Sequence, residues 1–246
     1  MASADVEIAK YLTKHGYHPR SSRHGDAICE FLLSDLLASC ESLRQAAVRD
    51  RIVYDTNFTV DPTSVDSWNA DLVMGPPAHA PEPKAKRSGP MAKGEPDEIW
   101  LAIDAKTIMT EHGKARRNRQ RDLNAFQDML HRKNAKTIVG GLLLVNIAER
   151  FLTPLARKAV GATEHKNIKR LVAETVSMME ALGRSGPNPG VPGLEALGII
   201  VVSHTNVPGE QTSLVVDPPA PNANAPSSYS SFLRDTCLAF SARFGS

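Results

Sequence analysis

The sequence predicts an α/β fold in which a central mixed β-sheet is flanked by helices. Three observations lead to this prediction. Between Asp26 and Asp50, apolar residues recur every three or four positions, which is the period of one helical face. Residues 137–147 are apolar on both faces, as is typical of a central strand that is covered on each side. Helical and strand patterns alternate along the chain, which is the order expected of an α/β domain.

The other elements follow from the same two periods, 3.6 residues for a helix and two for a strand. We expect further helices over the stretch marked by Leu123, Phe126 and Leu130, at 164–182 and at 227–240. Further strands are expected at 52–54, 58–60, 70–74, 98–103, 197–203 and 213–216. The length of 246 residues fits a single domain (1–246) with long insertions, and its core is expected at about 25–216.

Residues 75–96 break this pattern with a stretch rich in proline and lysine. Its apolar content is low, so it offers little to a hydrophobic core. A segment of this length without regular elements is normally functional or disordered. We therefore expect a flexible insertion between the strands at 70–74 and 98–103.

Composition and charge exclude several classes of protein. A content of 41% hydrophobic and 23% charged residues is typical of a globular chain. The sequence has no signal-peptide pattern and nothing near the roughly 18 apolar residues of a membrane span, so we expect a cytoplasmic protein without a membrane partner. Three cysteines without a C-x-x-C pair argue against a disulfide framework and a zinc ribbon. Because the net charge is only +2, evidence for a nucleic-acid partner must come from where the charges lie.

Two carboxylates and a lysine lie at the ends of two expected strands. Asp71 belongs to the strand at 70–74, and Asp104 and Lys106 follow the strand at 98–103. Neighbouring strands are about 4.8 Å apart, so carboxylates at matched heights can share one cation. Side chains two positions apart point to the same face, which puts acid and amine together. Oxygen ligands of this kind suit Mg²⁺, and a lysine beside them can orient or deprotonate a water, or stabilise the transition state of phosphodiester hydrolysis.

Positive charge concentrates directly after these residues. Five cations lie within eight positions without an intervening acid: Lys114, Arg116, Arg117, Arg119 and Arg121. Such a run is either a solvated helix face or a set of contacts to DNA phosphates, and both interpretations stay open. On the second interpretation these five residues bind DNA.

With these residues the chain resembles the PD-(D/E)XK nuclease superfamily, best known from type II restriction endonucleases. The resemblance rests on a helix, a strand carrying Asp71, a second strand running into Asp104-Ala105-Lys106, and a following helix; it covers roughly residues 25–147. It implies a Mg²⁺-dependent endodeoxyribonuclease that cuts double-stranded DNA, commonly as a homodimer. It also implies that Asp71, Asp104 and Ala105 hold the metal while Lys106 assists the attacking water.

Two positions of the family pattern leave alternatives. The family has a proline before the first acid, and this chain has Ala70 there, so Asp61 and Asp66 stay as alternatives to Asp71. Many members carry an assisting acid on the first helix, and Glu30 is the match in position. Glu30 is therefore either a further catalytic residue or a partly exposed glutamate at the edge of the helix.

Other classes of function are also compatible with the sequence. A repair, junction-resolving or modification-dependent nuclease would share the fold. A non-catalytic DNA-binding protein would keep the fold without the activity. A small-molecule α/β enzyme would show no salt-sensitive binding of DNA.

Overall fold

The centre of the molecule is an eight-stranded mixed sheet with the strand order β10-β9-β6-β5-β2-β1-β4-β3. The structure is a computed structural model that describes residues 3–19, 21, 23–61, 67–82, 85–153 and 161–245. The strands of the sheet are β1 (Val53–Val60), β2 (Trp68–Gly75), β3 (Arg87–Ser88), β4 (Met91–Lys93), β5 (Leu101–Ile108), β6 (Ile138–Asn146), β9 (Ala196–Ser203) and β10 (Ser213–Val215). A separate hairpin pairs β7 (Arg150–Thr153) with β8 (Gly161–Glu164).

The sheet has a parallel centre, and its outer strands pair mostly antiparallel. Strands β5, β6 and β9 run parallel to one another, whereas β2 is antiparallel to both β5 and β1. Strand β10 lies antiparallel to β9 at one edge. The chain thus forms an antiparallel meander of β1, β2 and β5, and α4 then leads to the parallel strand β6.

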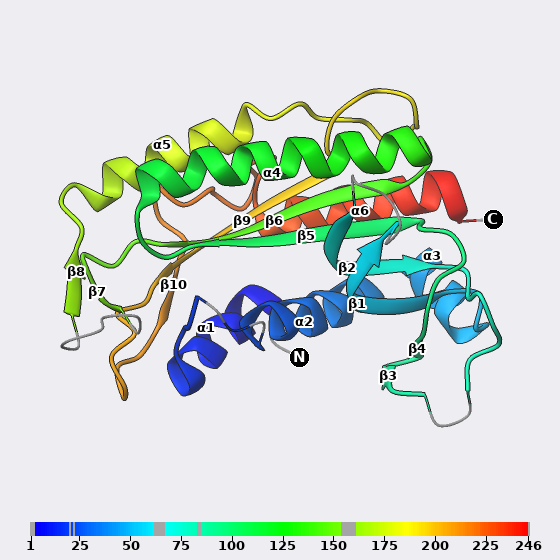
Figure 1. Cartoon of the computed structure of the whole chain (residues 1–246), viewed down its shortest axis with the longest axis horizontal. Helices are drawn as coiled ribbons and strands as arrows, with labels where there is room; N and C mark the ends of the chain where they lie inside the picture. Colours follow the sequence, from blue (N-terminus) through cyan, green and yellow to red (C-terminus); the bar gives the residue numbers. More distant parts are fainter. Residues whose placement is uncertain are drawn as a thin grey trace.

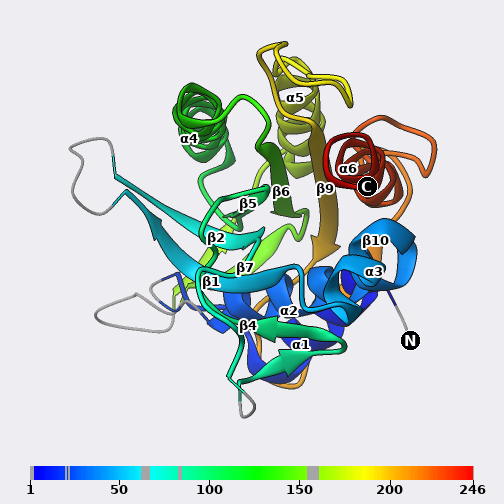
Figure 2. The ribbon, with the colours of Figure 1, turned by 90° about the vertical axis from the view of Figure 1, so that its right-hand side faces the viewer.

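Helices cover both faces of this sheet (Figure 1). The helices are α1 (Ala4–His15), α2 (Arg23–Ser39), α3 (Glu41–Val48), α4 (His112–Lys133), α5 (Ile168–Glu180) and α6 (Tyr229–Phe244). Buried residues of α1, α2, α3 and α6 share one core cluster, and those of α4 and α5 share the other. Figure 2 shows α4 and α5 on one side of the strands and α1 and α2 on the opposite side. The predicted α/β class with a mixed, helix-flanked sheet is confirmed.

Strand β6 lies at the heart of both cores. All nine of its residues are buried, as its two-sided apolar pattern predicted. On α4, Leu123, Phe126 and Leu130 repeat at intervals of three and four and are buried in the cluster between this helix and the sheet. Full burial of such an apolar side chain contributes about 1.5–3 kcal/mol. Gly140 permits close packing, since a Cβ there would lie 2.5 Å from Cδ1 of Ile103.

The N-terminal region differs from the single helix expected at 26–50. The chain leaves the helix at Cys40, which is extended with φ −113° and ψ 101°, so that α2 and α3 are separate. Periodicity alone did not reveal the break, because apolar residues keep their helical spacing across it. Helix α1 was not expected, and its buried face packs against α2.

The proline-rich insertion also differs from the flexible loop expected at 75–96. Its described residues include β3 and β4, and β4 adds to the sheet in parallel with β1. Three of its cations form ion pairs within the molecule: Lys86 with Glu30, Arg87 with Asp50 and Lys93 with Asp55. These ion pairs connect the insertion to the rest of the molecule. The low apolar content of the insertion could not indicate this role.

A disulfide joins Cys40 to Cys237 on α6, whereas Cys29 is free and buried. The expectation drawn from the odd number of cysteines was therefore wrong, because an odd count does not prevent two of three thiols from meeting. Within the described residues, every helix is too short or too polar to cross a membrane.

Candidate active site

Asp71 and Asp104 lie opposite each other where β2 and β5 separate. The last paired residues of the two strands are Leu72 and Ile103, and continuing this register places Asp71 across from Asp104. Beyond this point a side chain replaces the backbone acceptor of the neighbouring strand. Oδ2 of Asp71 accepts a hydrogen bond from the Ala105 N–H at 2.7 Å. Strands β2 and β5 thus pair across the insertion, and Asp71 reaches the Asp104-Ala105-Lys106 segment directly.

Lys106 lies between the two acids. Its Nζ is 2.5 Å from Oδ1 of Asp104 and 3.9 Å from Oδ2 of Asp71. The contact to Asp104 agrees with the prediction that residues two apart on a strand share a face. The side chain of Lys106 is 19% exposed, so the amine lies at the boundary between the buried acid and solvent.

Asp104 is a fully buried carboxyl group, with an exposed fraction of 0%. Burial raises its pKa to about 7, Lys106 opposes this rise, and the neighbouring Asp71 adds to it. Among the residues that the structure describes, none donates a hydrogen bond of regular geometry to either carboxyl oxygen. Oδ1 contacts the Lys106 amine at 2.5 Å, so within the described residues Oδ2 is the buried oxygen left open to a cation or a proton.

A cavity of about 240 Å³ opens beside Asp71 and Lys106, and Asp104 is buried behind its lining residues. Asp71, Ala105 and Lys106 form one wall, and the start of α2 with the preceding segment forms another. His24 and Tyr17 lie there with ring centroids 4.7 Å apart. Burial lowers the pKa of His24, although the charge of Asp71 opposes this effect. The cavity therefore brings a carboxylate and an amine together with an imidazole and a phenol.

The lining of this cavity includes Tyr17, His24 and Asn57, which the sequence did not identify as site residues. Tyr17 and His24 belong to a segment without a recognisable pattern, and no signal in the sequence assigned them. Asn57 did leave a signal, since it interrupts two β-prone segments that the structure joins into the single strand β1. Asparagine tolerates backbone conformations that other strand residues avoid.

The five cations after the site all belong to α4 and do not precede the helix. Their helical positions divide them into two groups. Lys114, Arg117 and Arg121 are exposed and recur at intervals of three and four, so they form a row on one helix face. Arg116 instead pairs with Glu174 of α5 at 2.6 Å, and Arg119 lines the cavity while pairing with Asp122 at 2.9 Å.

Glu30 does not join the two aspartates. It is exposed and forms an ion pair with Lys86 of the insertion. Of the alternative first acids, Asp61 pairs with Lys133 of α4, and Asp66 lies outside the described residues. Asp71 is thus the carboxylate that the structure brings to Asp104.

The site offers a divalent cation few protein ligands. Within the described ranges, no three histidine, cysteine or carboxylate side chains are grouped to hold a metal. Mg²⁺ does not require such a group, because it is usually held by one or two carboxylates together with water and substrate phosphate. Ala105 has no ligating side chain, but its carbonyl leaves the extended strand on the same side as its N–H, toward Asp71. The donor set therefore fits Mg²⁺ with a largely aqueous shell.

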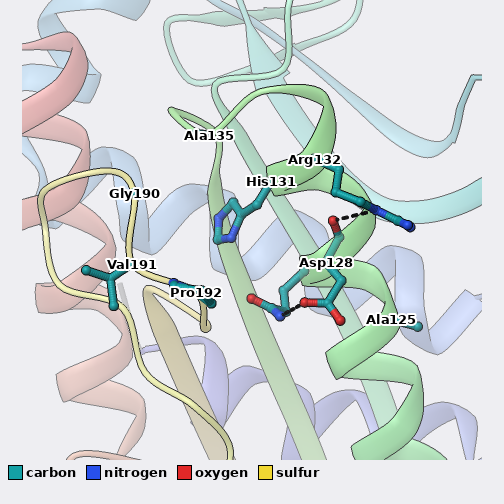
Figure 3. A pocket seen from close by; sticks show the side chains of 9 residues that line it. Ala125, Asp128, His131, Arg132, Ala135, Gly190, Val191 and Pro192 are labelled. Carbon is teal, nitrogen blue, oxygen red and sulfur yellow. Dashed lines mark hydrogen bonds between the residues drawn. The ribbon is translucent and has the colours of Figure 1, made fainter.

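A larger cavity of about 550 Å³ lies elsewhere, between the second half of α4 and the loop at 190–192 (Figure 3). Asp128 is the one acid among its described lining residues, and its backbone carbonyl accepts a hydrogen bond from Arg132 at 3.2 Å. This cavity has no pair of acids with a lysine. Chemistry, rather than size, therefore identifies the smaller cavity as the candidate active site.

Comparisons with protein-family models, with curated proteins and with solved structures give no match.

Proposed function

We propose that the protein is a Mg²⁺-dependent endodeoxyribonuclease that hydrolyses phosphodiester bonds of double-stranded DNA. The observation that carries the proposal is the buried carboxyl group of Asp104, which faces Asp71 and contacts Lys106 but has no regular hydrogen-bond donor among the described residues. The order of helix, three-stranded antiparallel meander with the acids on its second and third strands, and helix further supports a PD-(D/E)XK-like core.

The residues divide the chemistry among themselves. Asp71, Asp104 and the carbonyl of Ala105 would hold the cation, which when bound makes the phosphorus more electrophilic and lowers the pKa of a bound water. Lys106 orients the attacking water, since its amine lies between the acids and solvent. Arg119, at the wall of the cavity, contributes positive charge toward a phosphate.

Double-stranded DNA is supported as the substrate by the exposed row of Lys114, Arg117 and Arg121. A type II restriction endonuclease acting as a homodimer is our first interpretation of the biological role. A repair, junction-resolving or modification-dependent nuclease would use the same site, so the fold does not separate them.

Plasmid cleavage with mapped ends tests the proposal. Wild-type protein with Mg²⁺ should cut supercoiled plasmid, and EDTA should abolish cutting. Asp104→Asn removes the charge that a metal needs, and Lys106→Ala removes the amine, so each should lower the rate by about 10²-fold or more. Asp128→Asn and Lys136→Ala, which change the same residue types away from the site, should cut like wild type.

A non-catalytic DNA-binding protein is the second candidate, because the basic row favours DNA binding whether or not cleavage occurs. Salt-sensitive binding without nicking of methylated or unmethylated plasmid would support this candidate and reject the nuclease. Equal cutting by the wild type, Asp104→Asn and Lys106→Ala would also reject the proposed nuclease site.

A further inference from the structure

We propose that Asn57 is a positioning residue whose left-handed backbone turns Asp71 out of the sheet and toward Ala105. Asn57 lies on β1 with φ 55°, a conformation that is rare within a strand. The importance of this orientation of Asp71 for metal binding rests on the proposed function. The orientation itself is a property of the fold.

The pairing of β1 with β2 is interrupted at this residue alone. The two strands keep one antiparallel register on both sides of the interruption, and in that register Asn57 stands opposite Asp71. This pair is missing from the ladder although its neighbours on both sides are paired. The left-handed Asn57 and the unpaired Asp71 therefore lie directly opposite each other in the hairpin of β1 and β2.

Both strands exchange faces at this step. On β1, Tyr54 belongs to the core on the α2 side, but Phe58, four residues later, packs against the core on the α4 side. On β2, Leu72 belongs to the core on the α2 side, whereas Ala70, two residues earlier, belongs to the core on the α4 side. A regular strand would keep residues an even number apart on one face. The hairpin therefore turns over at Asn57, and Figure 2 shows β1 and β2 continuing as a ribbon away from the rest of the sheet.

This turn explains how a strand side chain can reach the neighbouring backbone. Side chains of a regular strand stand perpendicular to the sheet, yet the Asp71 carboxylate accepts the Ala105 N–H at 2.7 Å, where a ladder carbonyl would normally lie. Asn57 also contacts α2, because its Nδ2 donates to Asp26 at 2.6 Å. The side chain of Asn57 also lines the cavity.

The residue type supports the proposal. Asparagine enters the left-handed region more readily than most residues, glycine enters it freely, and β-branched residues resist it. Asn57→Val should therefore return β1 to a regular strand and withdraw Asp71. Asn57→Ala should do so less strongly, which provides a second variant if the valine protein does not fold. Asn57→Gly should keep the turn.

Amide hydrogen exchange of Ala105, followed by NMR, reports the aim of Asp71 without requiring any activity. Asp71→Ala gives the rate expected when the acceptor is absent. We expect Asn57→Val to approach that rate, at least about tenfold faster than wild type, because hydrogen bonds to charged groups are worth at least one such factor. Asn57→Gly should stay near the wild-type rate, and amides of β6 serve as the reference for global opening.

The matched control is Asn167→Val, since Asn167 has the same residue type and φ 57° but caps α5 far along the chain. This variant also forces a β-branched residue into a left-handed backbone conformation. The exchange rate of the Ala105 amide, relative to the amides of β6, should nevertheless stay at the wild-type value. Titration with Mn²⁺ then links the aim to the metal: Asn57→Val should weaken binding about tenfold if it removes one charged ligand contact.

Each outcome decides between the possibilities. Wild-type exchange of Ala105 in Asn57→Val and Asn57→Ala, or equal loss of protection in Asn57→Gly and Asn57→Val, would overturn the positioning role. If the wild type neither binds Mn²⁺ nor cuts DNA, the proposed function fails, while the exchange rates still decide whether Asn57 aims Asp71.

Discussion

At the scale of single residues, Asp104 couples the stability of the fold to pH. A carboxyl group in the unfolded chain titrates near pH 3.9, whereas burial raises the pKa of Asp104 to about 7. The folded state therefore binds the proton more tightly, and the stability gained from protonation is complete below about pH 4 and lost as pH rises through 7. Asp104→Asn keeps the shape without the charge. Without metal, its free energy of unfolding should exceed that of the wild type increasingly between pH 5 and 8, by on the order of 2 kcal/mol.

Urea unfolding in EDTA at several pH values measures this difference. The matched control is Asp97→Asn, which neutralises an exposed aspartate and should follow the wild-type profile. Parallel profiles of wild type and Asp104→Asn between pH 5 and 8 would contradict the prediction, since they would mean that the buried group is ionised at no cost.

The sequence predicted the residues of the site unevenly, for physical reasons. The two-residue spacing of Asp104 and Lys106 determines their common face on any strand, so this part was predictable. The reach of Asp71 depends on a left-handed residue on a neighbouring strand, and strand periodicity carries no information about it. Tyr17 and His24 meet the site through the packing of α1 and α2, which is a tertiary contact without a local pattern.

At the scale of elements, α4 separates two kinds of basic residue. Lys114, Arg117 and Arg121 are exposed, and on the proposed function each phosphate contact that they make would release counterions. Replacing any one with alanine should weaken DNA binding and reduce the slope of log K against log salt concentration by about 0.9. Fluorescence anisotropy with a duplex, measured over a series of salt concentrations, checks this prediction.

Arg116→Ala is the control on the same helix, because Arg116 is 14% exposed and occupied by Glu174 at 2.6 Å. Its loss should lower the melting temperature slightly by removing an ion pair between α4 and α5, and it should leave the salt slope unchanged. A slope that falls equally in Arg116→Ala would show that the row has no special place in DNA binding.

The elements also show where the sequence pattern is insufficient. Helix α4 and strand β6 were predictable because their burial follows one period throughout. The break at Cys40 and the strands of the insertion were not, because both are fixed by distant partners: Cys237 in the first case, and β1 in the second. Basic residues that look free in the sequence are neutralised there by acids far along the chain.

At the scale of the whole molecule, the disulfide between Cys40 and Cys237 ties the α2–α3 junction to the C-terminal helix across 197 positions. Closing so long a loop restricts the unfolded chain and stabilises the fold by about 2–4 kcal/mol. For a chain of this size, reduction should therefore lower the melting temperature by roughly 10 °C. Calorimetry of the oxidised protein with and without a thiol reductant measures the shift.

Two serine variants separate the disulfide from other effects of the reductant. Cys40→Ser should melt at the reduced temperature under both conditions, whereas Cys29→Ser, which changes the free buried thiol, should remain sensitive to reduction. Thiol titration of the denatured wild type, without reductant, should find one reactive thiol in each chain, because Cys40 and Cys237 are joined. Three reactive thiols would mean that α6 is held by packing of Phe232 and Phe240 against the sheet and α2, without a covalent link to the N-terminal helices.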